Sequence, residues 1–91
     1  MQLLTDDQIS KELTQLTGWE RINNQIEKVF NTKNFIYTIG FVNQVALLAE
    51  RADHHPDILV QYSKVTITLY THSMGGITEK DINLAKEIEQ L

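Results

Sequence analysis

The clearest β-strand signal in the chain is the run Val65-Thr66-Ile67-Thr68-Leu69-Tyr70-Thr71-His72. Aliphatic and more polar side chains alternate along it, so its three aliphatic residues are predicted to share one face of a sheet. The threonines, Tyr70 and His72 then lie on the other face or at the end of the strand. A shorter strand at Ile58–Tyr62 and a turn at Ser63-Lys64 precede this run, and together they predict a β-hairpin.

A second hairpin is predicted at residues 19–30, upstream of the first. Its strands would be Trp19–Ile22 and Gln25–Phe30. The intervening Asn23-Asn24 favours a turn, because asparagine tolerates a positive φ angle. Residues of the second strand again alternate, which is typical of a sheet with one buried face.

Helices are predicted near both ends of the chain from their capping signals. Thr5 and Gln8 form a capping-box pattern, and the apolar positions that follow recur at helical spacing until Gly18. Thr78 and Asp81 form a similar pattern at the start of the last helix. The buried side of that helix is predicted to consist of Leu84, Ala85, Ile88 and Leu91.

The strongest helical periodicity runs from Phe35 to about Arg51. Its apolar stripe is broad, which predicts a helix that lies across a sheet and also against a partner subunit. Gly40 inside this helix costs about 1 kcal/mol relative to alanine, so a close packing contact is predicted there. The stripe consists of Phe35, Ile39, Val42, Ala46 and Ala49, widened by Phe41, Val45 and Leu48.

The predicted order of elements is helix, hairpin, long helix, hairpin, helix. Paired strands separated by helices predict an α+β fold, with a four-stranded antiparallel sheet and three helices packed on one face. The length of 91 residues fits one domain, residues 1–91. A domain of this size buries a modest core, so association with further copies of the chain would help to stabilise it.

The composition argues against several classes of function. A net charge of −4, a pI near 5.2 and scattered lysines and arginines disfavour binding to nucleic acid or to an anionic membrane. The chain has no cysteine, which removes disulfides, thiolate nucleophiles and zinc–thiolate sites. The first residues do not resemble a signal peptide, and no apolar run reaches membrane-spanning length. We therefore expect a cytoplasmic protein.

Two of the three histidines are contiguous in Asp53-His54-His55-Pro56-Asp57, and the third is His72. Histidine suits proton transfer near neutral pH because its unperturbed pKa is about 6.5. Pro56 favours an extended backbone at His55, so the side chains of His54 and His55 are predicted to diverge. The pattern favours a site between this loop and the end of the 65–72 strand. Ordinary surface histidines are the alternative interpretation.

Other polar groups near the histidines have competing interpretations. Glu50 and Asp53 either orient an imidazole or solvate the end of a helix. A zinc site made of three imidazoles is a second hypothesis, although adjacent histidines are an unusual ligand spacing. Gly75-Gly76 lacks the pattern of a phosphate-binding loop and is predicted to be a turn.

The segment Ala49-Glu50-Arg51-Ala52-Asp53-His54-His55-Pro56-Asp57 closely resembles the signature of the pterin-4a-carbinolamine dehydratases. This resemblance implies a homodimer or homotetramer that converts a 4a-hydroxytetrahydropterin into a quinonoid dihydropterin and water. The reaction recycles the pterin of aromatic amino acid hydroxylases and needs no metal or organic cofactor. The resemblance continues through Tyr62, Lys64-Val65, Ile67, Leu69, Thr71-His72, Gly76, Ile77-Thr78, Asp81 and Ala85.

The resemblance also assigns catalytic roles to the histidines. It implies that His54 and His72 form the acid–base pair, because the substrate must lose both a hydroxyl and a proton. It further implies that His55 binds and orients the pterin. That division agrees with the divergence expected for two adjacent side chains.

Four further residues are implied to serve substrate binding. Glu50 and Asp53 would hold imidazoles or contact the pterin ring. Asp81 would support His72 from the start of the last helix, and Thr71 would help to define the pocket.

The chain departs from the family pattern at a few positions. Ile58 stands where the family usually has tryptophan, so an aromatic wall of the pocket is missing. Tyr70 stands where a smaller residue is common and would narrow the pocket. Ser73-Met74 also differs from the usual loop.

A non-enzymatic role is the alternative function. Some family members bind transcription factors through their helices, and the 35–51 helix would be the corresponding surface here. The three intact histidines argue against a purely structural role, because a dimerisation or coactivator module has no need of them.

Overall fold

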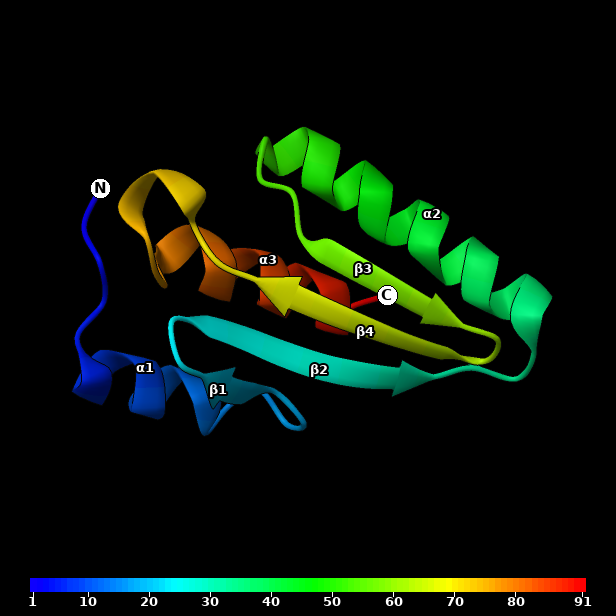
Figure 1. Ribbon diagram of the computed structural model, residues 1–91, viewed down its shortest axis with the longest axis horizontal. Helices are drawn as coiled ribbons and strands as arrows, with labels where there is room; N and C mark the ends of the chain where they lie inside the picture. The colour runs from blue at the N-terminus through cyan, green and yellow to red at the C-terminus, as the bar shows by residue number, and fades with distance from the viewer.

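Three α-helices and one four-stranded antiparallel sheet make up the computed structural model, which describes residues 1–91 (Figure 1). The strands lie in the order β1-β2-β4-β3, so the two hairpins are joined along β2 and β4. The α+β fold predicted from the sequence is confirmed. In chain order the elements are α1 Asp6–Leu13, β1 Glu20–Ile22, β2 Gln25–Asn31, α2 Phe35–Ala52, β3 Asp57–Gln61, β4 Lys64–Leu69 and α3 Glu79–Glu89.

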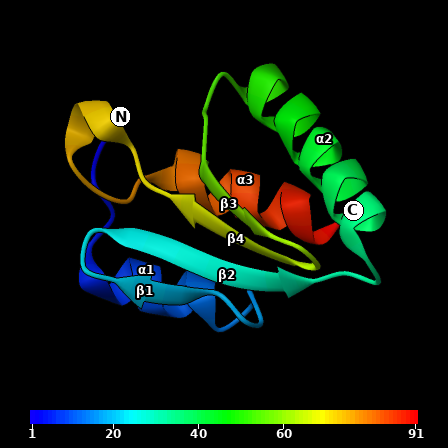
Figure 2. The same ribbon diagram turned by 45° about the vertical axis from the view of Figure 1, so that its right-hand side comes forward.

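The core lies between one face of the sheet and the helices. Figures 1 and 2 show α1, α2 and α3 on the same side of the strands. Val65, Ile67 and Leu69 of β4 have no exposed surface, which confirms the alternation predicted for this strand. Ile26 of β2 pairs with Leu69 and is equally buried, so the two central strands contribute most of the buried sheet surface.

Side-chain caps begin both terminal helices as predicted. The Thr5 hydroxyl accepts from the Gln8 amide at 3.1 Å, and the Gln8 side chain accepts from the Thr5 amide at 2.8 Å. Asp81 accepts from the Thr78 amide at 2.9 Å in the same way at the start of α3. The buried side of α3 includes Leu84, Ala85 and Ile88, whereas Leu91 is half exposed, contrary to the prediction.

The buried side of α2 differs from the predicted stripe. Val45 and Ala49 are buried as expected, but the third fully buried residue of the helix is Thr38. The Thr38 hydroxyl donates to the Asn34 carbonyl at 3.1 Å, which allows a polar side chain to be buried there. Phe35 and Ile39, which belonged to the predicted stripe, are exposed. Apolar residues surround most of this helix, so periodicity alone could not fix which side faces the sheet.

The prediction of a close contact at Gly40 is wrong within one copy of the chain. A Cβ atom built on Gly40 would have no neighbour within 4 Å. The glycine lies on the outer side of α2, among exposed apolar residues.

No helix, α2 included, is long and apolar enough to cross a membrane.

The strand that carries the clearest signal ends earlier than predicted. β4 stops at Leu69, and His72 begins a short 3-10 turn, His72–Met74. An isolated bridge between Thr71 and Gly76 closes this turn, and Gly75 adopts a positive φ of 69° within it. The chain therefore reverses direction just after β4, and His72 lies at the end of the sheet rather than in it.

Candidate active site

Two loops that are distant in sequence form a pocket at one end of the sheet. One is the connection from α2 to β3, and the other is the turn after β4; both lie at the same end of the molecule (Figure 1). The pocket has a volume of about 280 Å³, which suits a small molecule. Its lining residues are Asp53, His54, His55, Tyr70, Thr71, His72, Ser73 and Lys80.

The backbone at the end of α2 places His54 inside this site. Asp53 ends the helix in the left-handed conformation, with φ 50° and ψ 44°. The His54 amide then donates to the Ala49 carbonyl at 3.1 Å, so the chain turns back toward the sheet. His54 is only 8% exposed, whereas its neighbour His55 is exposed, which confirms that their side chains diverge.

Asp81 is the buried anchor of His54. The two side chains lie 2.5 Å apart between His54 Nε2 and Asp81 Oδ1. The other carboxylate oxygen of Asp81 accepts from the Thr71 hydroxyl and the Thr78 amide, both at 2.9 Å. Because a carboxylate only accepts, the hydrogen shared with His54 resides on Nε2.

The threonine hydroxyls extend this network in one direction. Thr71 has a single hydroxyl hydrogen and donates it to Asp81. The 2.8 Å bond between Thr78 and Thr71 must therefore run from the Thr78 hydroxyl to the Thr71 oxygen. Each buried polar group then has a partner, so the network fixes the position of the His54 ring.

The second nitrogen of His54 remains available to the pocket. Nδ1 makes no hydrogen bond within the protein, and no fully buried side-chain nitrogen or oxygen lacks a partner. Nδ1 is therefore accessible to solvent, and His54 lines the pocket. One nitrogen of this imidazole is anchored in the core while the other is free to exchange a proton.

His55 lies on the solvent side of the same loop. Its Nε2 atom is 3.5 Å from a carboxylate oxygen of Glu50, and both side chains are mostly exposed. An exposed ion pair at this distance contributes little to stability. Glu50 does not line the pocket itself, and His55 is the lining residue that it pairs with.

His72 is held by a different kind of partner. It is exposed and begins the 3-10 turn after β4. The Tyr70 hydroxyl lies 3.0 Å from His72 Nδ1, and the two ring centroids are 4.2 Å apart. No carboxylate pairs with this imidazole, unlike the other two histidines.

The pocket contains most of the residues predicted for the site. Asp53, the three histidines and Thr71 line it, whereas Glu50 and Asp81 reach it through His55 and His54. The predicted contact of Asp81 with His72 is wrong. Asp81 bonds instead to His54, which follows α2, and to Thr71, which precedes the 3-10 turn.

Sequence reasoning missed two lining residues and misjudged a third. Ser73 was predicted only to be a departure from the family loop, and no role was predicted for Lys80. Lys80 could have been found from its position directly before Asp81, which was predicted to be a site residue. Tyr70, interpreted as an obstruction, provides the partner of His72. Ile58 packs against the hydrophobic core and does not line the pocket.

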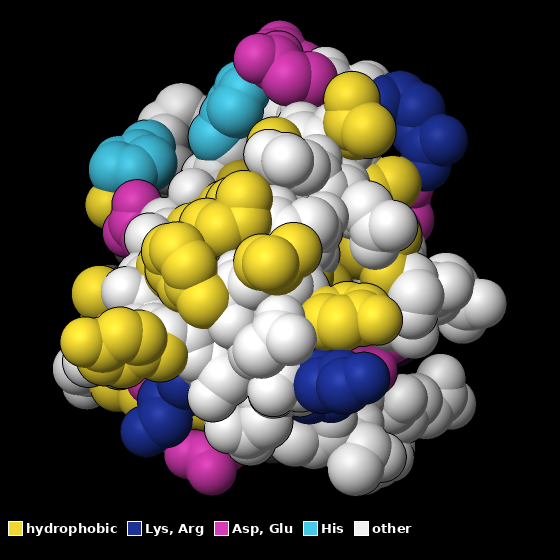
Figure 3. Space-filling model, turned by 90° about the vertical axis from the view of Figure 1, so that its right-hand side faces the viewer, with side chains coloured by type: hydrophobic (Ala, Val, Ile, Leu, Met, Phe, Trp, Pro, Cys, Tyr) yellow, Lys and Arg dark blue, Asp and Glu magenta, His cyan; other side chains and the backbone are white.

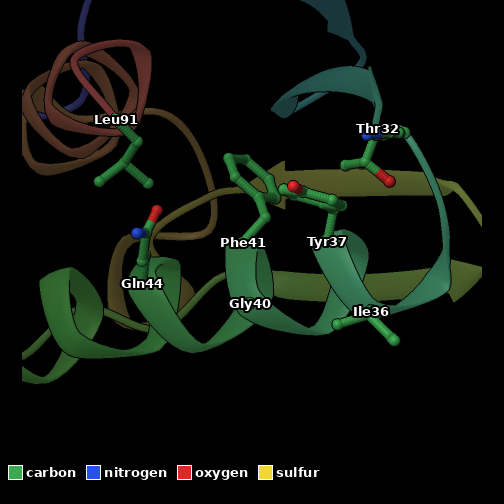
Figure 4. A pocket seen from close by; sticks show the side chains of 8 residues that line it. Thr32, Ile36, Tyr37, Gly40, Phe41, Gln44 and Leu91 are labelled. Carbon is green, nitrogen blue, oxygen red and sulfur yellow. The ribbon is translucent and has the colours of Figure 1, made fainter.

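A second, larger cavity lies apart from the histidines. It has a volume of about 400 Å³ and lies between α2 and the end of the chain. Figure 4 shows Tyr37, Phe41 and Gln44 of α2 on the side that faces Thr32 and Leu91. No histidine or carboxylate side chain lines it, so the histidine pocket is the better candidate for chemistry. Nowhere in the structure do three metal-ligating side chains converge.

The sequence matches one protein family over almost its entire length. Residues 2–91 match the family described as pterin 4 alpha carbinolamine dehydratase. A protein of Picosynechococcus sp., whose name assigns it provisionally to the pterin-4-alpha-carbinolamine dehydratases, is 49% identical over 88 residues, covering 97% of this chain and 96% of that protein. A protein of Aquifex aeolicus with the same name is also 49% identical, over 97% of this chain and 89% of that protein.

Solved structures with the same fold carry more than one description. A structure from Brucella melitensis, described as a transcriptional coactivator/pterin dehydratase, has a TM-score of 0.93 and 38% identity, covering 97% of this chain and 96% of that one. A pterin dehydratase-like protein described as a RuBisCO assembly factor in the alpha-carboxysome has a TM-score of 0.66, covering 79% of this chain and 83% of its own. At 22% identity, the second comparison shows the fold alone.

Proposed function

The chain belongs to the pterin-4a-carbinolamine dehydratase family, and on this premise we propose that it removes water from a 4a-hydroxytetrahydropterin. His54 and His72 form the acid–base pair of this reaction. One observation carries the proposal: each of these imidazoles lines the same pocket and has one nitrogen engaged by the protein, which leaves the other free. The free nitrogens are Nδ1 of His54 and Nε2 of His72.

The reaction needs two proton transfers and no redox step. The substrate has a hydroxyl on C4a and a hydrogen on N5. The C4a–O bond breaks, and the leaving hydroxyl takes its electron pair together with a proton from one imidazole. The second imidazole accepts the N5 proton, and the N5–H electron pair forms the C4a=N5 double bond. Water and the quinonoid dihydropterin are the products, and imidazoles supply both steps near neutral pH.

The remaining pocket residues bind and orient the pterin. His55 is at the exposed rim, backed by Glu50, and suits a role in holding the ring rather than in proton transfer. Asp53 lines the pocket and offers carboxylate oxygens to the nitrogens of a pterin, whereas Thr71, whose hydroxyl is engaged by Asp81 and Thr78, shapes the wall of the pocket. Asp81 is completely buried, so its contribution to binding passes through His54.

The test of this function is the decay of freshly generated 4a-hydroxytetrahydropterin, followed by its absorbance. The uncatalysed decay and the decay with heat-denatured protein are the references. General acid–base catalysis by the imidazoles of His54 and His72 should accelerate the decay about 10²- to 10⁴-fold. A folded protein that leaves the decay at the uncatalysed rate would contradict the proposal.

The outer face of α2 supports a homodimer or homotetramer. We define this face by the exposed residues Phe35, Ile36, Tyr37, Ile39 and Leu47. Ile36 is 79% exposed and Leu47 is 72% exposed, and several large apolar side chains exposed on one helix are typical of an interface. Figure 3 views the molecule from the end at which α2 begins and shows hydrophobic side chains gathered there. Gly40 lies among them with open space above it, which would let a helix of a second copy approach closely.

A partner-binding role through the same face is the second candidate function. The description of the Brucella structure as a transcriptional coactivator favours it, together with the exposed apolar residues of α2. Light scattering after size-exclusion chromatography distinguishes self-association through this face from binding of a different protein. Leu47→Lys should convert an oligomer into monomers, while Asn83→Lys on the exposed surface of α3 should not. A wild-type protein that is already monomeric would favour a different protein as the partner.

A further inference from the structure

We propose that Tyr70 is a positioning residue of the histidine pocket, which acts by holding the imidazole of His72 through its Nδ1 atom. This inference rests on the proposed dehydration and names a residue that the reaction requires beyond the histidines. It follows from the 3.0 Å distance between the Tyr70 hydroxyl and His72 Nδ1, and from the two rings that lie against one another.

His72 has no other side-chain partner. Its backbone belongs to a three-residue 3-10 turn, and its side chain is exposed. Without Tyr70, an exposed side chain on such a turn would sample several rotamers. The ring of Tyr70 and its hydroxyl therefore restrict the orientation in which His72 meets a substrate.

Tyr70 itself is placed by rigid structure. It directly follows β4, whose last residue, Leu69, is completely buried. It directly precedes Thr71, which is buried and bonded to Asp81. Both neighbours are therefore fixed, and Tyr70 and His72, two residues apart, lie on the same side of the chain.

A hydroxyl is a suitable partner for an imidazole that must both gain and lose a proton. The carboxylates beside His54 and His55 can only accept, so they favour an imidazole that carries hydrogen on the facing nitrogen. For Nε2 of His72 to gain and lose a proton, Nδ1 must carry its hydrogen in the neutral ring as well as in the protonated one. In both states this Nδ1–H donates to the Tyr70 oxygen. The bond therefore persists through both states, and Nε2 remains the nitrogen that faces the reaction.

Tyr70→Phe tests this role because it removes one oxygen and keeps the ring. We expect kcat for 4a-hydroxytetrahydropterin to fall about 10-fold, with KM within about twofold of wild type, because positioning affects the proton transfer more than binding. Tyr62→Phe is the matched control, since Tyr62 is 84% exposed and does not line the pocket. It should leave kcat unchanged.

A double variant distinguishes positioning from a general loss of packing. If Tyr70 acts through His72, Tyr70→Phe should have no further effect on the rate of a His72→Ala protein. Effects of the two changes that multiply would overturn the proposal. So would a wild-type kcat for Tyr70→Phe.

Nitrogen-15 shifts of the His72 ring provide a readout that does not depend on activity. Loss of the hydroxyl should shift the His72 Nδ1 resonance and leave those of His54 unchanged. Identical His72 shifts in wild type and Tyr70→Phe would overturn the proposal even if the protein is a dehydratase. A clear His72 shift in a protein that dehydrates no pterin would instead support the contact and refute the proposed function.

Discussion

His54 and His72 line the same pocket, but the protein holds them in different ways. His54 is buried, and a chain of hydrogen bonds through Asp81, Thr71 and Thr78 fixes it to the core. His72 is exposed on a short turn and has Tyr70 as its single side-chain partner. The buried side of the site therefore contributes to the stability of the fold, whereas the exposed side can change without unfolding the protein.

The largest effect on stability is expected for Asp81→Ala. The change removes the acceptor of three buried donors, namely His54 Nε2, the Thr71 hydroxyl and the Thr78 amide. Buried donors without acceptors should lower the free energy of unfolding by about 3 kcal/mol or more. Urea unfolding followed by the fluorescence of the buried Trp19 measures this loss.

Glu79→Ala is the control for Asp81→Ala. Glu79 is an exposed carboxylate in the same first turn of α3 and makes no side-chain hydrogen bond. Its loss should cost less than about 1 kcal/mol, the usual contribution of a charge near a helix end. Equal destabilisation by the two changes would show that Asp81 acts as a helix-end charge rather than as an anchor.

A smaller loss is expected for Thr71→Val, which keeps the shape of the side chain. It removes one donor to Asp81 and the acceptor of the Thr78 hydroxyl. The free energy of unfolding should fall by about 1–2 kcal/mol. The same urea titration applies, and an unchanged midpoint would mean that water replaces the lost hydroxyl.

On the exposed side, His72→Ala should scarcely affect stability. The imidazole has few neighbours, so the free energy of unfolding should change by less than about 0.5 kcal/mol. Thermal and urea unfolding of the variant check this. A loss comparable to that of Asp81→Ala would remove the distinction between the two halves of the site.

The smallest effect is expected for Glu50→Gln. The Glu50–His55 pair is exposed and 3.5 Å apart, so stability should change by less than about 0.5 kcal/mol. If Glu50 orients His55 for pterin binding, KM should rise a few-fold while kcat stays constant. A fall in kcat with an unchanged KM would assign the pair to the chemical step.

The sequence predicted the sheet and the divergence of the adjacent histidines because both follow from local rules. The alternation at Val65, Ile67 and Leu69 and the effect of Pro56 on His55 depend only on near neighbours. The partner of Asp81 was not predictable in this way. It depends on how α3 packs against the end of α2, and no local pattern encodes that contact.

Two other features were hidden for similar reasons. The residues after Leu69 continue the composition of a strand, so the early end of β4 becomes visible only through the bridge between Thr71 and Gly76. The orientation of α2 was ambiguous because its apolar residues surround the helix. Tertiary packing selected the side that contains Thr38, and the stripe through Phe35 and Ile39 remained outside.

The most direct test of this account is the rate of 4a-hydroxytetrahydropterin dehydration by a folded His72→Ala protein. We expect unfolding parameters close to those of wild type, together with a loss of about 10²-fold or more in the enzymatic rate. That result would place a proton-transfer step at the exposed turn. A His72→Ala protein that dehydrates the pterin as fast as wild type would contradict the assignment of His72 to the chemistry.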